Sequence, residues 1–252
     1  MTFNYLWRLI ATGFSYIVFG LGGLLLSFLV FPSVIIFNRD KKRRKKKLRS
    51  LISYSFRYFL KMMDFLGVLN FSIKGGEVLQ NESHCLLVAN HPTLIDVVAI
   101  IAFTPNACCV VKGDLWRNPF IKMVILGAEY IPNDNSSIVL SKCKESIYNG
   151  DVLVIFPEGT RTRDGETVQF KRGAAHLIHG LKCHVRCVFM ECRPLTLSKG
   201  VSWYAIPRST PNFSLVVGGR FDFYSKIDSS LPRPLAVRKL NRLLIQQYCG
   251  NG

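Results

Sequence analysis

The sequence predicts an α/β domain with one mostly parallel sheet flanked by helices, preceded by an N-terminal membrane-embedded helical segment. Two observations support this prediction. From Phe71 onward, short apolar runs alternate with longer helical segments, which is the rhythm of β-α-β units. Before that point, a long uncharged stretch is followed directly by a strongly basic run. With 252 residues, of which 49% are hydrophobic, the chain can bury the core of one ordinary domain and requires no second.

The first 38 residues are predicted to be a membrane anchor. Leu9 to Phe37 is a stretch of 29 residues without a charged side chain. It is too long for a secretory signal peptide, and its basic flank lies on the wrong side. A straight helix of this length would measure about 43 Å, against roughly 30 Å for the hydrocarbon core, and Pro32 and nearby glycines could bend it. A spanning helix and a bent or re-entrant anchor are therefore both open. A buried helix of a soluble protein fits this length less well.

Residues 39–50 are predicted to be a polybasic juxtamembrane segment. The chain has 33 Lys and Arg against 16 Asp and Glu, and the run from Arg39 to Arg49 supplies +8 of the net +17. Charge of this sign implies an anionic partner. Because the run follows the apolar stretch and lacks interleaved aromatic residues, we expect an anionic membrane surface and no nucleic acid. The positive-inside tendency places the rest of the chain in the cytoplasm, at the inner membrane, with the N-terminus facing outward.

Residues 51–252 are predicted to form the single α/β domain. Its first helix, Leu51 to Phe71, carries Arg57, Lys61 and Asp64 on one face, so it either lies in the lipid headgroup layer or packs on the domain. The apolar runs then predict five strands, at residues 84–90, 107–111, 151–156, 184–190 and 212–219. Five helices are expected between and after them, from about 93, and at about 116–126, 138–148, 173–180 and 234–248.

The eight cysteines are predicted to be reduced and mostly buried. They contain no C-x-x-C pair, and a cytoplasmic domain keeps its thiols free. Cys183, His184, Cys187 and Cys192 lie close together in the sequence, but their spacing fits no zinc pattern, and the segment reads as a strand. We therefore expect no disulfide and no metal ion.

The loop after the first predicted strand carries a candidate catalytic pair, His91 and Asp96. Reactive groups in α/β sheets collect beyond the carboxyl ends of strands. Thr93 is available as the N-cap of the following helix, which would place Asp96 one turn into it. An imidazole can remove a hydroxyl proton near neutral pH, and a carboxylate on its other nitrogen fixes the tautomer. The pair could thus activate an alcohol for acyl transfer without a protein nucleophile.

A His-x4-Asp spacing alone is weak, because it arises by chance in a chain of this size. The loop after the 151–156 strand adds a second signal, since a buried strand there ends in Phe156-Pro157-Glu158-Gly159-Thr160-Arg161-Thr162-Arg163. The guanidinium groups of Arg161 and Arg163 can make bidentate contacts with phosphate. The two loops together predict a site for a phosphorylated or otherwise anionic substrate.

The motifs NHPTLID and FPEGTRT resemble the first and third signature blocks of the glycerolipid acyltransferase superfamily, which includes the 1-acylglycerol-3-phosphate acyltransferases. Between them, VVKGDLWRNPF resembles the second block, and FKRGAAH resembles the stretch after the third. The similarity covers roughly Leu86 to Met190. The segments HPTLIDVV and LTLSKGVSWYAIP resemble bacterial acyltransferases associated with aryl-polyene-type lipid assembly more closely than those of housekeeping phosphatidate synthesis.

The resemblance implies a membrane-bound O-acyltransferase of α/β fold. Its donor would be acyl-CoA or acyl-carrier protein, and its acceptor a lysophospholipid or related lipid, with no metal ion and no cofactor. His91 would be the base and Asp96 its partner. The resemblance also implies a set of substrate-binding residues: Asn90, Lys112, Glu158, Gly159, Thr160 and Arg161.

Two positions depart from the family pattern. Asn133 stands where the second block usually has an arginine that holds the acceptor phosphate, and Cys187 stands where the fourth block usually has a proline. The strongest rival interpretation is a catalytically inactive, membrane-tethered module that binds anionic lipid. The joint presence of His91, Asp96 and an intact third block favours the enzyme.

Overall fold

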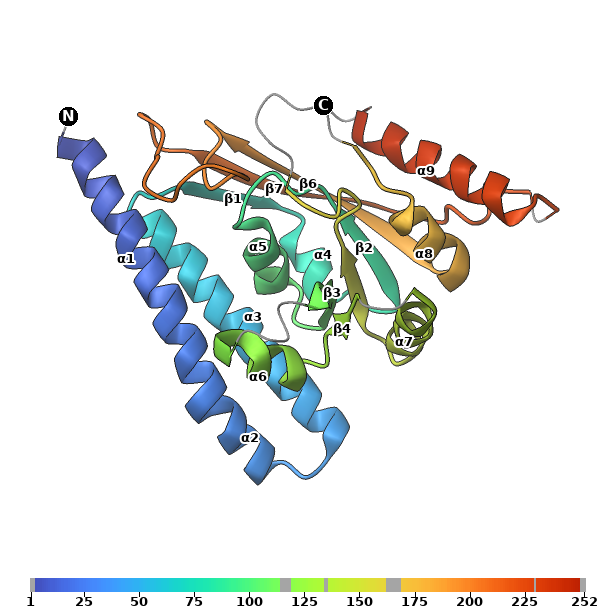
Figure 1. The fold of residues 1–252 in the computed structure, drawn as a ribbon, viewed down its shortest axis with the longest axis horizontal. Helices are drawn as coiled ribbons and strands as arrows, with labels where there is room; N and C mark the ends of the chain where they lie inside the picture. Colours follow the sequence, from blue (N-terminus) through green and yellow to red (C-terminus); the bar gives the residue numbers. More distant parts are fainter. Residues whose placement is uncertain (1–2, 114–118, 134–135, 162–168, 229, 250–252) are drawn as a thin grey trace.

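The chain folds around one seven-stranded sheet with the strand order β1-β7-β6-β2-β5-β3-β4 (Figure 1). The computed structural model describes residues 3–113, 119–133, 136–161, 169–228 and 230–249. All neighbouring strands in it are parallel except β6 and β7, which are antiparallel. The predicted α/β fold with a mostly parallel sheet is therefore confirmed.

Five of the strands lie where the apolar runs predicted them, and two short ones were not predicted. The bounds are β1 Asn70–Lys74, β2 Cys85–Ala89, β3 Ala107–Val111, β4 Ile131–Pro132, β5 Val152–Ile155, β6 His184–Arg193 and β7 Asn212–Phe221. Every residue of β2 and β5 is buried, as expected for central parallel strands. The unpredicted strands β1 and β4 lie at the two edges of the sheet, where a strand needs less apolar character.

Helices cover both faces of the sheet. The bounds are α4 Gly76–Gln80, α5 Asp96–Phe103, α6 Pro119–Gly127, α7 Ser136–Tyr148, α8 Gly173–Leu181 and α9 Arg233–Cys249. Leu87 of β2 points into a core that includes α5 and α6, whereas its neighbours Leu86 and Val88 point into a second core with α7, α8 and α9. The helix expected from about 93 begins at Asp96, and Trp116, the expected start of α6, lies outside the described residues.

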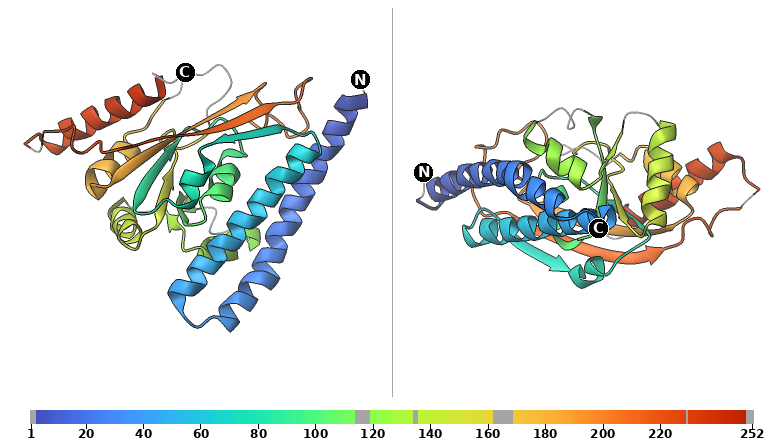
Figure 2. Two further views of the ribbon diagram at one scale, coloured as in Figure 1. Left: turned by 180° about the vertical axis from the view of Figure 1, so that it is seen from behind. Right: turned by 90° about the horizontal axis from the view of Figure 1, so that it is seen from below.

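The N-terminal segment forms a long helix that packs against an antiparallel partner (Figures 1 and 2). It consists of α1 (Phe3–Leu25), a π-helical turn η1 (Leu26–Val30) and α2 (Phe31–Phe37). The π-helical turn lies directly before Pro32, whose ring disturbs the helical hydrogen bonding. The segment from Phe3 to Phe37 is long and apolar enough to cross a membrane, and only 17% of its most apolar window is buried.

The partner helix α3 (Lys41–Phe65) includes most of the basic run. The prediction that a helix begins at Leu51 was wrong, because Asp40 caps a helix that starts ten residues earlier by accepting a hydrogen bond from the Arg43 N–H. Of the two placements left open for the Leu51–Phe71 helix, the structure has it packed on the domain. Ser53 Oγ donates to the Ala102 carbonyl of α5, and so does Arg57.

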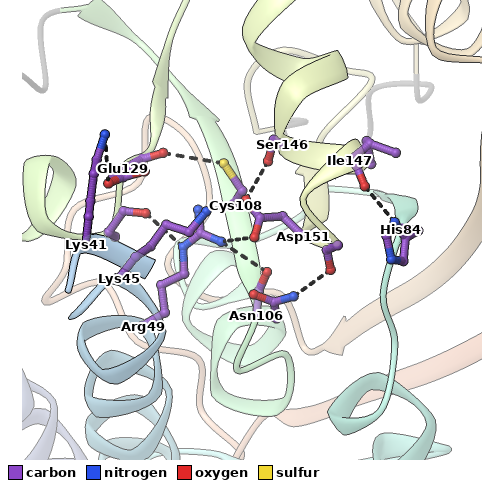
Figure 3. Close-up of polar contacts among 12 residues, drawn as sticks. Lys41, Lys45, Arg49, His84, Asn106, Cys108, Glu129, Ser146, Ile147 and Asp151 are labelled. Atoms are coloured by element: carbon purple, nitrogen blue, oxygen red, sulfur yellow. Dashed lines mark hydrogen bonds and ion pairs between the residues drawn. The ribbon is translucent and has the colours of Figure 1, made fainter. Parts of the chain in front are cut away.

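Part of the basic run turns inward to the domain rather than outward. Arg49 and Lys45 both contact the carboxylate of Asp151 at the start of β5, at 2.8 and 3.2 Å (Figure 3). The side chains of Arg49 and Asp151 are 2% and 4% exposed, so this pair is buried. Lys41 approaches Glu129 at 3.8 Å, with both side chains more exposed. These contacts join α3 to the end of the sheet opposite the loops after β2 and β5.

The N-terminal helix is attached to the domain near both of its ends. Near its start, the buried Arg8 guanidinium donates to the carbonyl groups of Pro207, Arg208 and Ser209. Near its other end, the fully buried Phe31 packs against Gly127 of α6 and Leu48 of α3. The helix therefore lies along the domain over most of its length.

Most of the cysteines are buried, as predicted. Cys85, Cys108, Cys109, Cys143, Cys187 and Cys192 are buried, whereas Cys183 is half-buried and Cys249 is exposed. All eight are free thiols. Burial raises the pKa of Cys187 to about 12 and that of Cys192 to about 11, so these thiols stay protonated at neutral pH.

Candidate active site

His91 and Asp96 meet at the carboxyl end of β2. The Nδ1 atom of His91 lies 2.8 Å from Oδ2 of Asp96. The Asp96 side chain is fully buried, whereas the His91 side chain is 15% exposed, so the imidazole forms the accessible end of the pair. The ring of Phe156, which follows β5, lies against the imidazole with 4.4 Å between the ring centres. With Nδ1 bonded to the carboxylate, Nε2 is the atom available to a substrate.

Thr93 holds the carboxylate of Asp96 in this position. The Thr93 N–H donates to Asp96 Oδ2 at 2.6 Å, and the Thr93 hydroxyl donates to Oδ1 at 2.5 Å. Thr93 is itself fully buried. The expectation that Thr93 caps the helix was wrong: the N-cap position is Ile95, which has no side-chain cap. Thr93 Oγ1 accepts a hydrogen bond from the Ile95 N–H in the preceding turn instead.

The environment of Asp96 acts on its charge in two directions. Burial raises the pKa of Asp96, because a carboxylate loses its hydration there. The hydrogen bonds and charge of His91, together with the two hydrogen bonds from Thr93, lower the pKa and favour the ionised form. Desolvation is the larger effect. The carboxylate therefore depends on all of its hydrogen-bond donors to remain an acceptor for the imidazole.

Asn90 contacts the backbone of the neighbouring strand rather than the open site. Its Nδ2 donates to the Met190 carbonyl at 2.7 Å, and its Oδ1 accepts from the Met190 N–H at 2.7 Å. The side-chain amide thus imitates a peptide group and continues the pairing of β2 with β6 past Ala89. This geometry fixes the backbone that leads into His91 and uses one N–H and the oxygen of the amide for pairing with β6.

Glu158 also binds the loop that carries His91. Its Oε1 accepts a hydrogen bond from the His91 N–H at 2.8 Å, and the residue is 4% exposed. The third signature block is therefore tied to the first by a charge-assisted hydrogen bond. Gly159 follows with a φ of +69°, a left-handed conformation that favours glycine, and the Lys171 side chain lies against it. Thr160 is half-buried beside these residues.

Arg161 is directed at a loop that runs beside the histidine. Its Nη1 donates to the Leu197 carbonyl at 3.0 Å and lies 3.4 Å from that of Ser198. The same Leu197 carbonyl accepts a hydrogen bond from the Leu94 N–H, three residues after His91. Arg161 therefore joins the loop after β5 to the connection between β6 and β7. Arg163 lies outside the described residues.

The two remaining positions lie further along the same edge of the sheet. Lys112 is exposed directly after β3, and Asn133 is exposed directly after β4. Because β3, β4 and β5 are parallel to β2, both residues lie beyond the carboxyl ends of their strands, as His91 does. The structure thus joins His91 to Asp96 and Glu158 by hydrogen bonds, while Asn90 and Arg161 bond to neighbouring backbone and Lys112 lies beyond β3.

Sequence reasoning assigned Thr93 a different role and did not find the contributions of Met190 and Leu197. Thr93 could have been found, because Thr-x-x-Asp is a reciprocal capping pattern in which the acid binds the Thr N–H. Met190 and Leu197 act through their backbone groups, so their side-chain identities give no signal. They become visible only when the strand order places β6 and its following loop beside β2.

Comparisons with known proteins agree with this fold and identify similar acyltransferases. Residues 70–191 match the protein-family model described as Acyltransferase. A 1-acyl-sn-glycerol-3-phosphate acyltransferase from Helicobacter pylori is 38% identical over 35% of this chain and 40% of its own length. The human 1-acyl-sn-glycerol-3-phosphate acyltransferase beta is 27% identical over 48% of this chain and 46% of its own length. These alignments thus span less than half of each relative.

The fold also resembles that of a solved structure. The crystal structure of the 1-acyl-sn-glycerophosphate (LPA) acyltransferase PlsC from Thermotoga maritima superposes with a TM-score of 0.71 at 18% sequence identity. The superposition covers 95% of each chain. It therefore includes the N-terminal helices as well as the region that the family model matches.

Proposed function

We propose that residues 70–191, which match the Acyltransferase family model, form a domain of the glycerolipid acyltransferase superfamily and that the protein is an O-acyltransferase. It moves an acyl group from a thioester donor to a hydroxyl group of a lysophospholipid or related lipid. The observation that carries this proposal is the hydrogen bond between His91 and the fully buried Asp96, which leaves the other nitrogen of the partly exposed imidazole available to a substrate.

The proposed mechanism uses His91 as general base and then as general acid. Nε2 takes the proton of the acceptor hydroxyl as its oxygen attacks the thioester carbon. Asp96 accepts the hydrogen bond from Nδ1–H, which fixes the tautomer and stabilises the imidazolium that forms. When the tetrahedral intermediate collapses, the C–S bond breaks and the imidazolium returns its proton to the leaving thiolate. No covalent acyl-enzyme is needed.

We further propose that the N-terminal helix lies in one leaflet rather than crossing the bilayer. This favours the bent or re-entrant alternative over an outward-facing N-terminus. The contacts of Arg8 with residues 207–209 and of Phe31 with α6 support it, because a helix attached to the domain at both ends cannot leave it to cross the membrane. Its exposed apolar side chains would then face lipid tails, with the catalytic domain on the cytoplasmic side of the inner membrane.

The acceptor is proposed to differ from lysophosphatidate. Asn133 is exposed beyond β4, where the family pattern has an arginine, and an amide makes a weaker bond to phosphate than a guanidinium does. The difference is about 1.5–3 kcal/mol, or roughly tenfold to more than a hundredfold in affinity. A lipid of the aryl-polyene type, or another hydroxylated lipid, is the alternative acceptor.

The test is an acyl-transfer assay with purified full-length protein in mixed micelles. Both donor types are offered with lysophosphatidate and with a lipid extract of the host as acceptors, and products are identified by mass spectrometry. We expect transfer to a hydroxylated lipid of the extract, weak transfer to lysophosphatidate, and a gain with lysophosphatidate in Asn133→Arg. Absence of acyl transfer to any acceptor would favour the rival interpretation, an inactive module that binds anionic lipid.

A further inference from the structure

A second basic surface lies at the end of the molecule away from the N-terminal helix. The sequence from residue 171 to 182 contains two lysines, one arginine and two histidines, and α9 contains four cations, yet neither segment has an acidic residue. All seven lysine and arginine side chains are exposed. We call them the α8–α9 surface: Lys171, Arg172, Lys182, Arg233, Arg238, Lys239 and Arg242.

The charges of this surface are not neutralised within the part of the chain that the structure describes. The ion pairs there involve α3, strands β6 and β7 and the His91–Asp96 pair, but none of these seven cations. One exposed carboxylate, Asp228, has its pKa lowered by hydrogen bonds from Ser230 and then by the charge of Lys239. The pKa of His176 is lowered by burial first and then by the neighbouring charges of Arg233, His179 and Arg172. The surface is therefore strongly positive.

The position of the α8–α9 surface excludes, as its partner, the bilayer that would hold the N-terminal helix. Figures 1 and 2 place α1 and α9 at opposite ends of the molecule, with the sheet between them. A bilayer that covers the apolar side chains of α1 therefore leaves α9 facing solution. The exposed residues of α9 include no aromatic side chain, which makes it a poor platform for stacking nucleic-acid bases.

Each helix of this surface begins or ends beside an element that carries the candidate active site. At the end of α9, the Tyr248 hydroxyl donates to the Val88 carbonyl at 2.7 Å, three residues before His91. Before α8, the Lys171 N–H donates to the Pro157 carbonyl of the third signature block. Measured back along α9 from Tyr248, Arg242 lies about 9 Å away and Arg238 about 15 Å away, at 1.5 Å per residue. The cations of α9 thus follow one another along the helix, leading away from the candidate active site.

We propose that the α8–α9 surface docks an acidic carrier protein that presents the acyl thioester to His91. This inference rests on the proposed function and names its donor class. Cations spread over several helical turns match the extended acidic face of a protein better than the compact phosphates of coenzyme A. Complementary charge of this kind steers a partner into register and speeds its association. The flexible arm of the carrier then spans the distance from α9 to the imidazole.

The test is a binding titration that does not depend on catalysis. Purified acyl-carrier protein with a fluorescent label is titrated with the full-length protein in detergent micelles, and anisotropy gives the dissociation constant. We expect the triple variant Arg238→Ala/Lys239→Ala/Arg242→Ala to bind on the order of tenfold more weakly than the wild type. The matched control Lys42→Ala/Arg43→Ala/Lys46→Ala removes three exposed cations of α3, and we expect it to change binding by less than about twofold.

A conservative variant guards against misfolding. Arg238→Lys/Arg242→Lys keeps the charge, so it should bind within about threefold of the wild type. Absence of carrier binding, or equal loss in the α9 variant and the α3 control, would overturn the proposal. So would binding of an oligonucleotide or of phosphatidylglycerol vesicles that depends on α9 while carrier binding does not. Carrier binding through α9 without acyl transfer would support the docking surface and refute the proposed function. Acyl transfer from acyl-CoA without carrier binding would support the proposed function and refute the docking surface.

Discussion

At the scale of single residues, Thr93 tests whether the position of Asp96 matters. Thr93→Val removes the hydroxyl that donates to Asp96 Oδ1 and leaves a buried carboxylate oxygen without that donor. We expect kcat to fall about tenfold to a hundredfold, because a hydrogen bond to a charged group is worth about 1.5–3 kcal/mol. Thr93→Ser keeps the hydroxyl and should retain most of the activity. Equal activity in the two variants, with unchanged thermal stability, would contradict a positioning role.

Glu158 offers a second test, because its charge and its hydrogen bond can be separated. Glu158→Gln keeps an oxygen that can accept from the His91 N–H, whereas Glu158→Ala leaves that N–H buried without an acceptor. If Glu158 acts by holding the His91 loop, the Gln variant should remain within about fivefold of the wild type and the Ala variant should lose most activity. The measurement is kcat for acyl transfer. An equally inactive Gln variant would show that the carboxylate charge itself is required.

The thiols provide a prediction that depends on pH. Burial raises the pKa of Cys85, Cys143 and Cys187 to about 12 and that of Cys183 to about 11, so at pH 8 these sulfur atoms remain protonated and poorly nucleophilic. We expect iodoacetamide at pH 8 to modify the exposed Cys249 and to leave acyl transfer unchanged. Peptide mass spectrometry and activity are read on the same sample. Inactivation that follows modification of a buried cysteine would show that a thiol takes part.

The candidate site was predictable from the sequence only in its titratable groups. His91, Asp96, Glu158 and Arg161 stand out because each ends a strand or follows it at short spacing. The contacts of Asn90 and Arg161 were not predictable. Asn90 bonds to a backbone carbonyl about a hundred residues away, and Arg161 bonds to one about thirty-six residues away. Those partners depend on the order of strands in the sheet, which the local sequence does not contain.

At the scale of elements, the ion pairs of α3 determine how firmly α3 and the N-terminal helix packed against it are held on the domain. Asp151→Asn leaves the guanidinium of Arg49 buried without its carboxylate, and breaking a buried pair costs about 3–5 kcal/mol. We expect the thermal midpoint in detergent to fall by roughly 5–15 °C. Lys41→Ala, which removes the exposed contact with Glu129, serves as the control and should have almost no effect. A midpoint unchanged by Asp151→Asn would show that this pair does not hold α3.

The elements themselves followed from hydrophobic pattern wherever burial was strong. The runs at β2, β3 and β5 are continuous and apolar, as central parallel strands require. The hydrophobic pattern did not predict a helix over Lys41–Arg49, because the run is almost entirely charged. It forms the first turns of α3, where Asp40 caps it and Asp151 accepts two of its cations. Edge strands such as β1, with alternating and partly exposed residues, gave too weak a signal.

At the scale of the whole molecule, the attachment of the N-terminal helix (α1, η1 and α2) at both ends predicts that both ends lie on one side of the membrane. Phe3→Cys and Phe37→Cys replace exposed side chains at the two ends of the helix, in a Cys249→Ser background that removes the exposed native thiol. A membrane-impermeant maleimide should label both variants from the cytoplasmic face of inverted vesicles and neither from the outer face. Labelling of residue 3 from the outer face alone would establish a spanning helix.

The proposed mechanism depends most on the role of His91, and one comparison of variants tests that role directly. Purified wild type, His91→Ala and Asp96→Asn are assayed for acyl transfer with the same donor and the same acceptor, after folding and membrane attachment have been shown to be equal. We predict that His91→Ala abolishes turnover and that Asp96→Asn loses most but not all of it, since orientation and charge are lost while the imidazole remains. Turnover by His91→Ala within about tenfold of the wild type would contradict the account, because such a small loss is below what a general base supplies.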